Sequence, residues 1–233
     1  MMFVSCTRKD VLYLKTVSVV LSEPNDRLAE VKGVCEASDV VIVCLGLDAT
    51  LEGEEGDTGN EFASGDKPDL NYPGLQNEIL KAAYESGKPV VLVSLTGSAM
   101  DLSWADEHIP AIVQAWYPGS RGGEAVARLL FGECSPEGKL PVTFYRSVEE
   151  LPEFTDYSMK GRTYRYMEQE ALYPFGYGLS YTEFSLSEPE ITVYEGDKVS
   201  ETGIIRKGTG MTVRTVISKY RVRWPEEKPY RFM

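Results

Sequence analysis

The stretch DVVIVCLGL, residues 39–47, decides how this chain folds. It is a short, continuous apolar run rich in valine and isoleucine, which is typical of a strand that is covered on both faces of a sheet. Two later runs have the same character, KPVVLVSL at 88–95 and PAIVQAW at 110–116. The sequence therefore predicts three buried strands.

Helical patterns lie before and between these runs. Residues 22–38 (SEPNDRLAEVKGVCEAS) and 73–89 (PGLQNEILKAAYESGKP) space their apolar side chains at helical intervals, and residues 120–132 (SRGGEAVARLLFG) begin and end with capping residues. Strands that alternate with helices form a mostly parallel sheet. We therefore expect an α/β fold, a three-layer sandwich with a mostly parallel sheet flanked by helices.

An acidic loop, GLDATLEGEEGDTGNEFASGD at 46–66, follows the first strand and holds seven Asp or Glu residues without a lysine or arginine. Ligands bind beyond the carboxyl ends of the strands in such sheets, so the loop is expected at the functional edge. Its length of about twenty residues far exceeds the usual ~2–6. Composition alone favours a solvated run of charges. The alternative is a glycosidase carboxyl group whose pKa is raised by its neighbours.

Composition and motifs exclude several classes of function. A net charge of −12 disfavours nucleic acid and anionic membranes as partners. The four cysteines lack metal-ligand spacing and read as reduced thiols, and neither an HExxH motif nor a phosphate-binding GxxxxGK[ST] motif is present. We therefore expect no metal and no organic cofactor. The single histidine, His108, is interpreted as a solvated loop side chain, not as part of a Ser-His-Asp site.

The two ends of the chain differ from its middle. Residues 1–21 are an unassigned N-terminal segment with charges where a signal peptide needs an apolar stretch, so the default location is cytoplasmic. Secretion of a full-length parent stays an open alternative. Residues 187–233 form a basic tail, in which 198–233 hold nine Lys or Arg against three Glu. This tail is either a truncated fibronectin-like module or unstructured.

Three blocks follow one another in a specific order: WYPGSRGGEAVARLLFG, SPEGKLPVTF and YPFGYGLSYTEF. With these blocks, residues 22–186 resemble the C-terminal domain of glycoside hydrolase family 3, the family of β-glucosidases and β-xylosidases. The resemblance implies an α/β sandwich that packs against an N-terminal (β/α)8 barrel. In the family, the barrel carries an aspartate nucleophile and a loop of the sandwich lends a glutamate acid/base.

The resemblance also suggests which side chains do the chemistry. Glu52, in GLDATLE, stands at the position of the family's general acid/base, and Glu54 and Glu55 are the runners-up because the loop aligns loosely. Asp66 and Lys67 stand where many relatives have an Asp-Arg pair near the substrate. For these two, a substrate-binding role is second to a structural one.

The implied enzyme is a retaining, exo-acting β-glycosidase of carbohydrate breakdown, with a β-linked glucoside or xyloside as substrate. Residues 1–21 are too few for a (β/α)8 barrel, so the nucleophile is expected in another chain or a longer gene product, and this chain alone is expected to be inactive. The alternatives are a stand-alone carbohydrate-binding or interaction domain and a gene fragment without activity.

Overall fold

The computed structural model describes most of the chain between residues 28 and 181, and the backbone of several strands outside it. The described residues are 2–6, 11–14, 28–47, 67, 69–153, 155–181, 184–186, 190–194, 198–207, 212–218 and 221–223. Side chains are described only from 28 to 181. The chain divides into two compact units, Met1–Arg128 with Leu140–Tyr177 and Leu129–Lys139 with Gly178–Met233.

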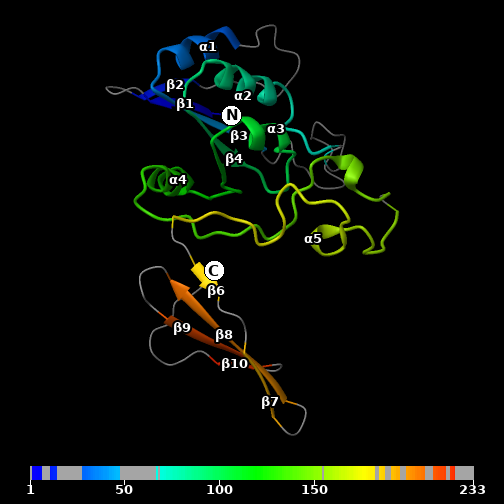
Figure 1. Ribbon diagram of the computed structural model, residues 1–233. Helices are drawn as coiled ribbons and strands as arrows, with labels where there is room; N and C mark the ends of the chain where they lie inside the picture. Colours follow the sequence, from blue (N-terminus) through cyan, green and yellow to red (C-terminus); the bar gives the residue numbers. More distant parts are fainter. Residues whose placement is uncertain are drawn as a thin grey trace. The chain divides into compact units, whose positions relative to one another are not determined.

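The first unit is built on a sheet with the strand order β2-β1-β3-β4-β5. The strands β3, β4 and β5 are parallel, whereas β1 runs antiparallel to both β3 and β2 (Figure 1). The strands are β1 (Met2–Cys6), β2 (Val11–Leu14), β3 (Val40–Gly46), β4 (Val90–Leu95) and β5 (Ala111–Gln114). The three strands predicted from apolar runs are thus confirmed, as β3, β4 and β5.

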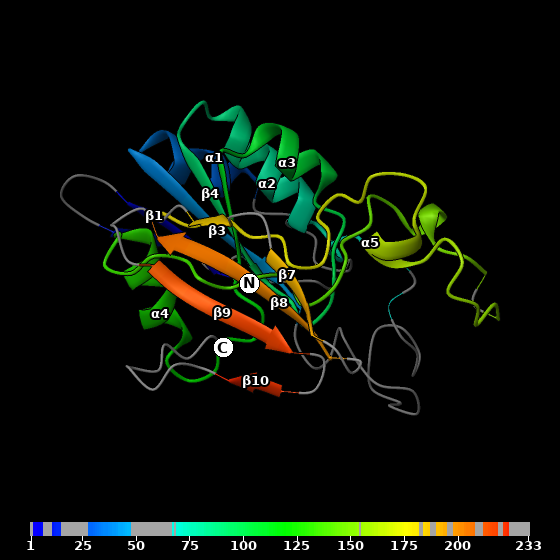
Figure 2. The same cartoon turned by 60° about the horizontal axis from the view of Figure 1, so that its bottom comes forward.

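Helices cover both faces of this sheet. The helices α1, α2 and α3 lie on one side and α4 on the other, as two views of the molecule show (Figures 1 and 2). The helices are α1 (Leu28–Glu36), α2 (Gln76–Glu85), α3 (Ser103–His108) and α4 (Gly122–Leu130). The predicted three-layer α/β sandwich is confirmed.

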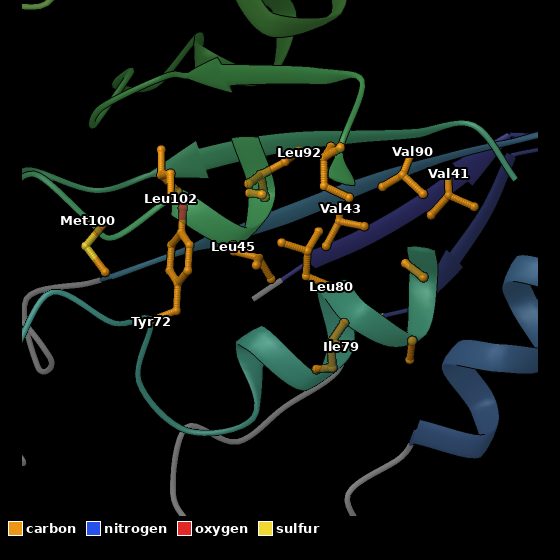
Figure 3. Packing of buried hydrophobic residues seen from close by; sticks show 14 of the residues in the cluster. Val41, Val43, Leu45, Tyr72, Ile79, Leu80, Val90, Leu92, Met100 and Leu102 are labelled. Atoms are coloured by element: carbon orange, nitrogen blue, oxygen red, sulfur yellow. The ribbon is translucent and has the colours of Figure 1, made fainter. Parts of the chain in front are cut away.

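The core of this unit lies between the sheet and α1, α2 and α3. Val41 and Val43 of β3 and Leu92 of β4 are fully buried. Leu80 of α2 points toward Val43 in the close view, and Ile79 lies on the same helix (Figure 3). Burial of such side chains supplies about 1.5–3 kcal/mol each, so the apolar runs that predicted the strands also stabilise them.

Two features differ from the expectations. Strand β5 is not covered on both faces: it lies at the edge of the sheet, where none of its residues is buried. His108 does not lie in a loop but ends helix α3, where its ring stacks on Trp104 at 4.4 Å between centroids and its Nδ1 lies 2.8 Å from the Trp104 carbonyl oxygen. The expected solvated side chain is therefore wrong, because an aromatic neighbour half-buries the imidazole.

The segment after α4 returns to the first unit. It contains η1 (Val148–Glu150) and the short helix α5 (Thr163–Tyr166). Phe144 is fully buried and forms an antiparallel bridge with Tyr173, whose hydroxyl donates to Asp106 Oδ1 at 2.6 Å. The ring of Trp116, just after β5, packs edge-on against Phe144. These contacts hold the segment on α3 and on the end of β5.

The described backbone of the second unit is an antiparallel sheet with the order β10-β9-β8-β6, and β7 pairs with β8. Its strands are β6 (Phe184–Leu186), β7 (Glu190–Tyr194), β8 (Lys198–Lys207), β9 (Thr212–Ser218) and β10 (Arg221–Arg223). No helix within the described ranges is both long and apolar enough to cross a membrane.

The buried face of β4 gives a first test of this architecture. Replacing Leu92 with alanine should lower the free energy of unfolding by about 2–5 kcal/mol, because the side chain is fully buried and leaves a cavity. Denaturant unfolding of the whole chain measures the loss. The control is Glu85→Ala at the exposed end of α2, which should change stability by less than about 0.5 kcal/mol. Equal effects of the two substitutions would contradict the assigned core.

Candidate functional site

The carboxyl ends of β3 and β4 and the last residue of β5 meet at one edge of the sheet, at Gly46, Leu95 and Gln114. The four predicted carboxylates Glu52, Glu54, Glu55 and Asp66 lie outside the described residues. The structure does describe the residues from which the acidic loop departs and those to which it returns. The candidate site is therefore built from these two ends.

The loop departs from a tightly held strand end. The Leu47 amide donates to the Leu95 carbonyl of β4 at 3.0 Å. Gln76, the first residue of α2, is 1% exposed, and its side chain bonds both backbone groups of Gly46. A Cβ atom on Gly46 would lie 2.1 Å from the Leu95 oxygen, so only glycine fits there.

The loop returns beside the turn that follows β4. Lys67 Nζ donates to the Ala99 carbonyl oxygen and contacts Met100 Sδ, each at 3.2 Å. Three residues later, the Leu70 carbonyl accepts from the Asp101 amide at 2.7 Å. The ammonium group of Lys67 thus has a structural contact, and its substrate-binding role stays a prediction.

Side chains just below this edge form hydrogen bonds between neighbouring segments. Tyr72 donates from its hydroxyl to Ser94 Oγ of β4 at 2.6 Å, and both side chains are buried. Gln114 of β5 donates to Thr96 Oγ1 at 3.0 Å, and Thr96 in turn donates to the Ser98 carbonyl. Each bond ties the carboxyl end of one strand to an adjacent segment. The described part of the edge is therefore a rigid frame and holds no group of three or more metal-binding side chains.

Gln76 was not among the residues predicted from the sequence. A signal was present, because Gln76 shares one helix face with Ile79, Leu80 and Ala83 at the spacing i, i+3, i+4 and i+7. A buried amide on an apolar face needs hydrogen-bond partners inside the protein. Its partner, Gly46, lies thirty residues away in sequence, so periodicity alone does not identify it.

Burial raises the pKa of the Tyr72 phenol well above its usual value, and the hydrogen bond to Ser94 offsets this only in part. The folded state therefore keeps this proton more tightly than the unfolded state. The contribution to the free energy of unfolding is constant below about pH 10, the ordinary tyrosine value, and should fall as pH rises further.

Tyr72→Phe should flatten this fall above about pH 10, because the titrating group is removed. Denaturant unfolding of the whole chain between about pH 8 and pH 11 measures the slope. Tyr157→Phe, at a ring that is 88% exposed, is the matched control and should leave the slope as in the wild type. A slope that Tyr72→Phe leaves unchanged would contradict the buried phenol.

Comparison with known proteins identifies the family. The model of the glycosyl hydrolase family 3 C-terminal domain matches residues 7–181. The chain belongs to glycosyl hydrolase family 3. The matched residues include the strands β2 to β5, the helices α1 to α5 and the segments that connect them. The match begins at residue 7, within the N-terminal segment 1–21 that the sequence analysis left unassigned.

Relatives of this family 3 chain are glycosidases. It is 49% identical over 167 residues to a xylan 1,4-β-xylosidase of Xylanibacter ruminicola, covering 71% of this chain and 19% of the relative. A periplasmic β-glucosidase of Salmonella typhimurium is 31% identical over 224 residues, which are 90% of this chain and 28% of that protein. A β-glucosidase structure from Erythrobacter marinus matches with a TM-score of 0.69 at 29% identity, covering 95% of this chain and 34% of that one.

Proposed function

We propose that this chain supplies the general acid/base of a retaining β-glycosidase, with Glu52 in that role. The observation that carries the proposal is the family match over residues 7–181, within which the Glu52 loop departs from the carboxyl edge of a parallel sheet. Such edges are where α/β sheets bind ligands. Because the chain spans 19% and 28% of the two curated relatives, the remaining machinery belongs to a partner domain, expected to be a (β/α)8 barrel.

The proposed reaction uses two carboxyl groups. A barrel aspartate attacks the anomeric carbon while Glu52 donates a proton to the leaving oxygen, and Glu52 then takes a proton from the water that releases the sugar. Retention requires the two carboxyl groups to be about 5–5.5 Å apart. The rigid frame would serve this geometry by fixing both ends of the acidic loop.

The substrate class follows from the relatives. The relative at 49% identity is a xylosidase and the one at 31% is a glucosidase, so β-xylosides are the first substrates to test and β-glucosides the second. Binding without hydrolysis would instead favour a carbohydrate-binding domain.

A domain exchange tests the proposal. The matched 167-residue segment of the Xylanibacter xylosidase is replaced by that of this chain, and hydrolysis of aryl β-xylosides is measured. We expect an active chimera in which Glu52→Gln lowers kcat by about 10²–10⁴-fold on a poor leaving group, since the proton donor is lost. On a good leaving group such as 2,4-dinitrophenol, where release of the sugar limits the rate of the variant, azide needs no general base and should restore turnover as the glycosyl azide.

Glu54→Gln and Glu55→Gln are the matched controls, because they remove the same charge within three residues of Glu52. Each should retain most of the activity. A loss confined to one of them would move the acid/base to that residue. An inactive but folded wild-type chimera would overturn the proposed function.

A further inference from the structure

The side chain of Gln76 pairs with one backbone residue in the way that a strand would. The Gly46 amide donates to Gln76 Oε1 at 2.8 Å, and Gln76 Nε2 donates to the Gly46 carbonyl oxygen at 2.9 Å. Two residues that face each other in an antiparallel ladder exchange the same pair of bonds. The carboxamide thus takes the place of a peptide group opposite Gly46.

The position of Gly46 explains why such a substitute is needed. Leu47 directs its amide to Leu95 of β4, and successive residues of a strand direct their backbone groups to alternate sides. The groups of Gly46 therefore face the other edge of β3, where β1 lies. The described pairs between β1 and β3 reach only to Cys44, two residues short of Gly46. Among the described residues, Gln76 is the one that pairs with these two backbone groups of Gly46.

The other side of Gly46 is fixed by β4. A Cβ atom at position 46 would lie 2.1 Å from the Leu95 carbonyl oxygen, so the two backbones lie close together at this point. Gln76 holds Gly46 from the opposite side, and Gln76 is itself held because it begins α2 with 1% of its surface exposed. The direction in which the chain leaves β3 is thereby set from two sides.

We propose that Gln76 is a positioning residue of the glycosidase: its buried amide completes the end of β3 and fixes the point from which the chain leaves toward Glu52, six residues beyond Gly46. The inference rests on the proposed function. It deepens that function by assigning the placement of the proton donor to a described residue of α2. Gln76 acts through the backbone and does not itself exchange protons with the substrate.

A positioning role differs from simple packing in its dependence on the leaving group. A general acid helps a poor leaving group to depart and is hardly needed by a good one. Misplacing the acid should slow the poor substrate selectively, whereas a general loss of folded enzyme slows both substrates equally. The ratio of the two kcat/KM values separates these cases.

The first measurement uses the whole chain. Gln76→Leu removes both bonds, and residue-resolved amide hydrogen exchange by NMR should show at least about tenfold faster exchange at Gly46, with Val43 in the middle of β3 unchanged. Gln114→Leu is the matched control, because it removes an amide that bonds Thr96 on a neighbouring segment. It should leave Gly46 unchanged. Unaltered exchange at Gly46 in Gln76→Leu would overturn the anchoring role.

The second measurement uses the active chimera described above. In Gln76→Leu, the kcat/KM ratio of phenyl to 2,4-dinitrophenyl β-xyloside should fall about 10–100-fold, a part of the full acid/base contribution, while Glu85→Ala, at an exposed residue of the same helix, should keep the wild-type ratio. An equal loss on both substrates would overturn the positioning role and leave the proposed function intact. A wild-type chimera without activity would instead overturn the proposed function, and with it the catalytic consequence assigned to Gln76.

Gln76→Glu keeps the shape of the side chain and covers the case in which the leucine variant does not fold. Its carboxylate accepts from the Gly46 amide but cannot donate to the Gly46 carbonyl, whereas the protonated acid does both. The kcat/KM ratio of phenyl to 2,4-dinitrophenyl β-xyloside in Gln76→Glu is divided by the wild-type ratio at the same pH. This quotient should rise toward one as pH falls. A quotient that stays below one at every pH would overturn the proposal.

Discussion

The parallel pairing of β3 with β4 is the constraint on which the rest of the first unit depends. Both strands are buried, and their apolar side chains form the surface on which α2 packs. At their carboxyl ends the two backbones approach so closely that position 46 accommodates only glycine. A sheet edge with so close a backbone approach is a suitable base for a long loop, because hydrogen bonds hold Gly46 and Lys67 on either side of it.

The hydrogen bonds near this edge share one arrangement. Tyr72 bonds Ser94, Gln76 bonds Gly46 and Gln114 bonds Thr96, so in each case a polar side chain joins the end of a strand to a different segment. Buried polar groups are strongly disfavoured without partners, and those with partners specify one arrangement of the backbone. Stability and geometry of the edge thus come from the same bonds.

The strands β3 and β4 were predictable because they are buried on both faces, and burial leaves a continuous apolar run in the sequence. The same rule overstated the burial of β5, since its apolar residues lie at a sheet edge. Helix α3 escaped prediction because its six residues, SWADEH, span fewer than two turns and show no apolar period. Its place is set by tertiary contacts such as the burial of Ala105.

For the site, the family blocks identified Glu52 as the acid/base candidate, and the structure describes the frame around its loop. The partnership of Gln76 and Gly46 was not accessible from the sequence, because it joins a side chain to a backbone thirty residues away. Hydrophobic periodicity records which residues face the core. It does not record which backbone groups a strand register leaves without a partner.

The acidic loop is held at its two ends by hydrogen bonds between Gly46 and Gln76 and between Lys67 and Ala99. None of these four residues lies between 48 and 66. These two bonds are therefore made by residues on either side of 48–66, and their partners belong to α2 and to the turn after β4. The anchoring of the loop is thus encoded outside the acidic sequence that it carries. The sequence that sets the charge of the loop and the sequence that sets its two end points are therefore separate parts of the chain.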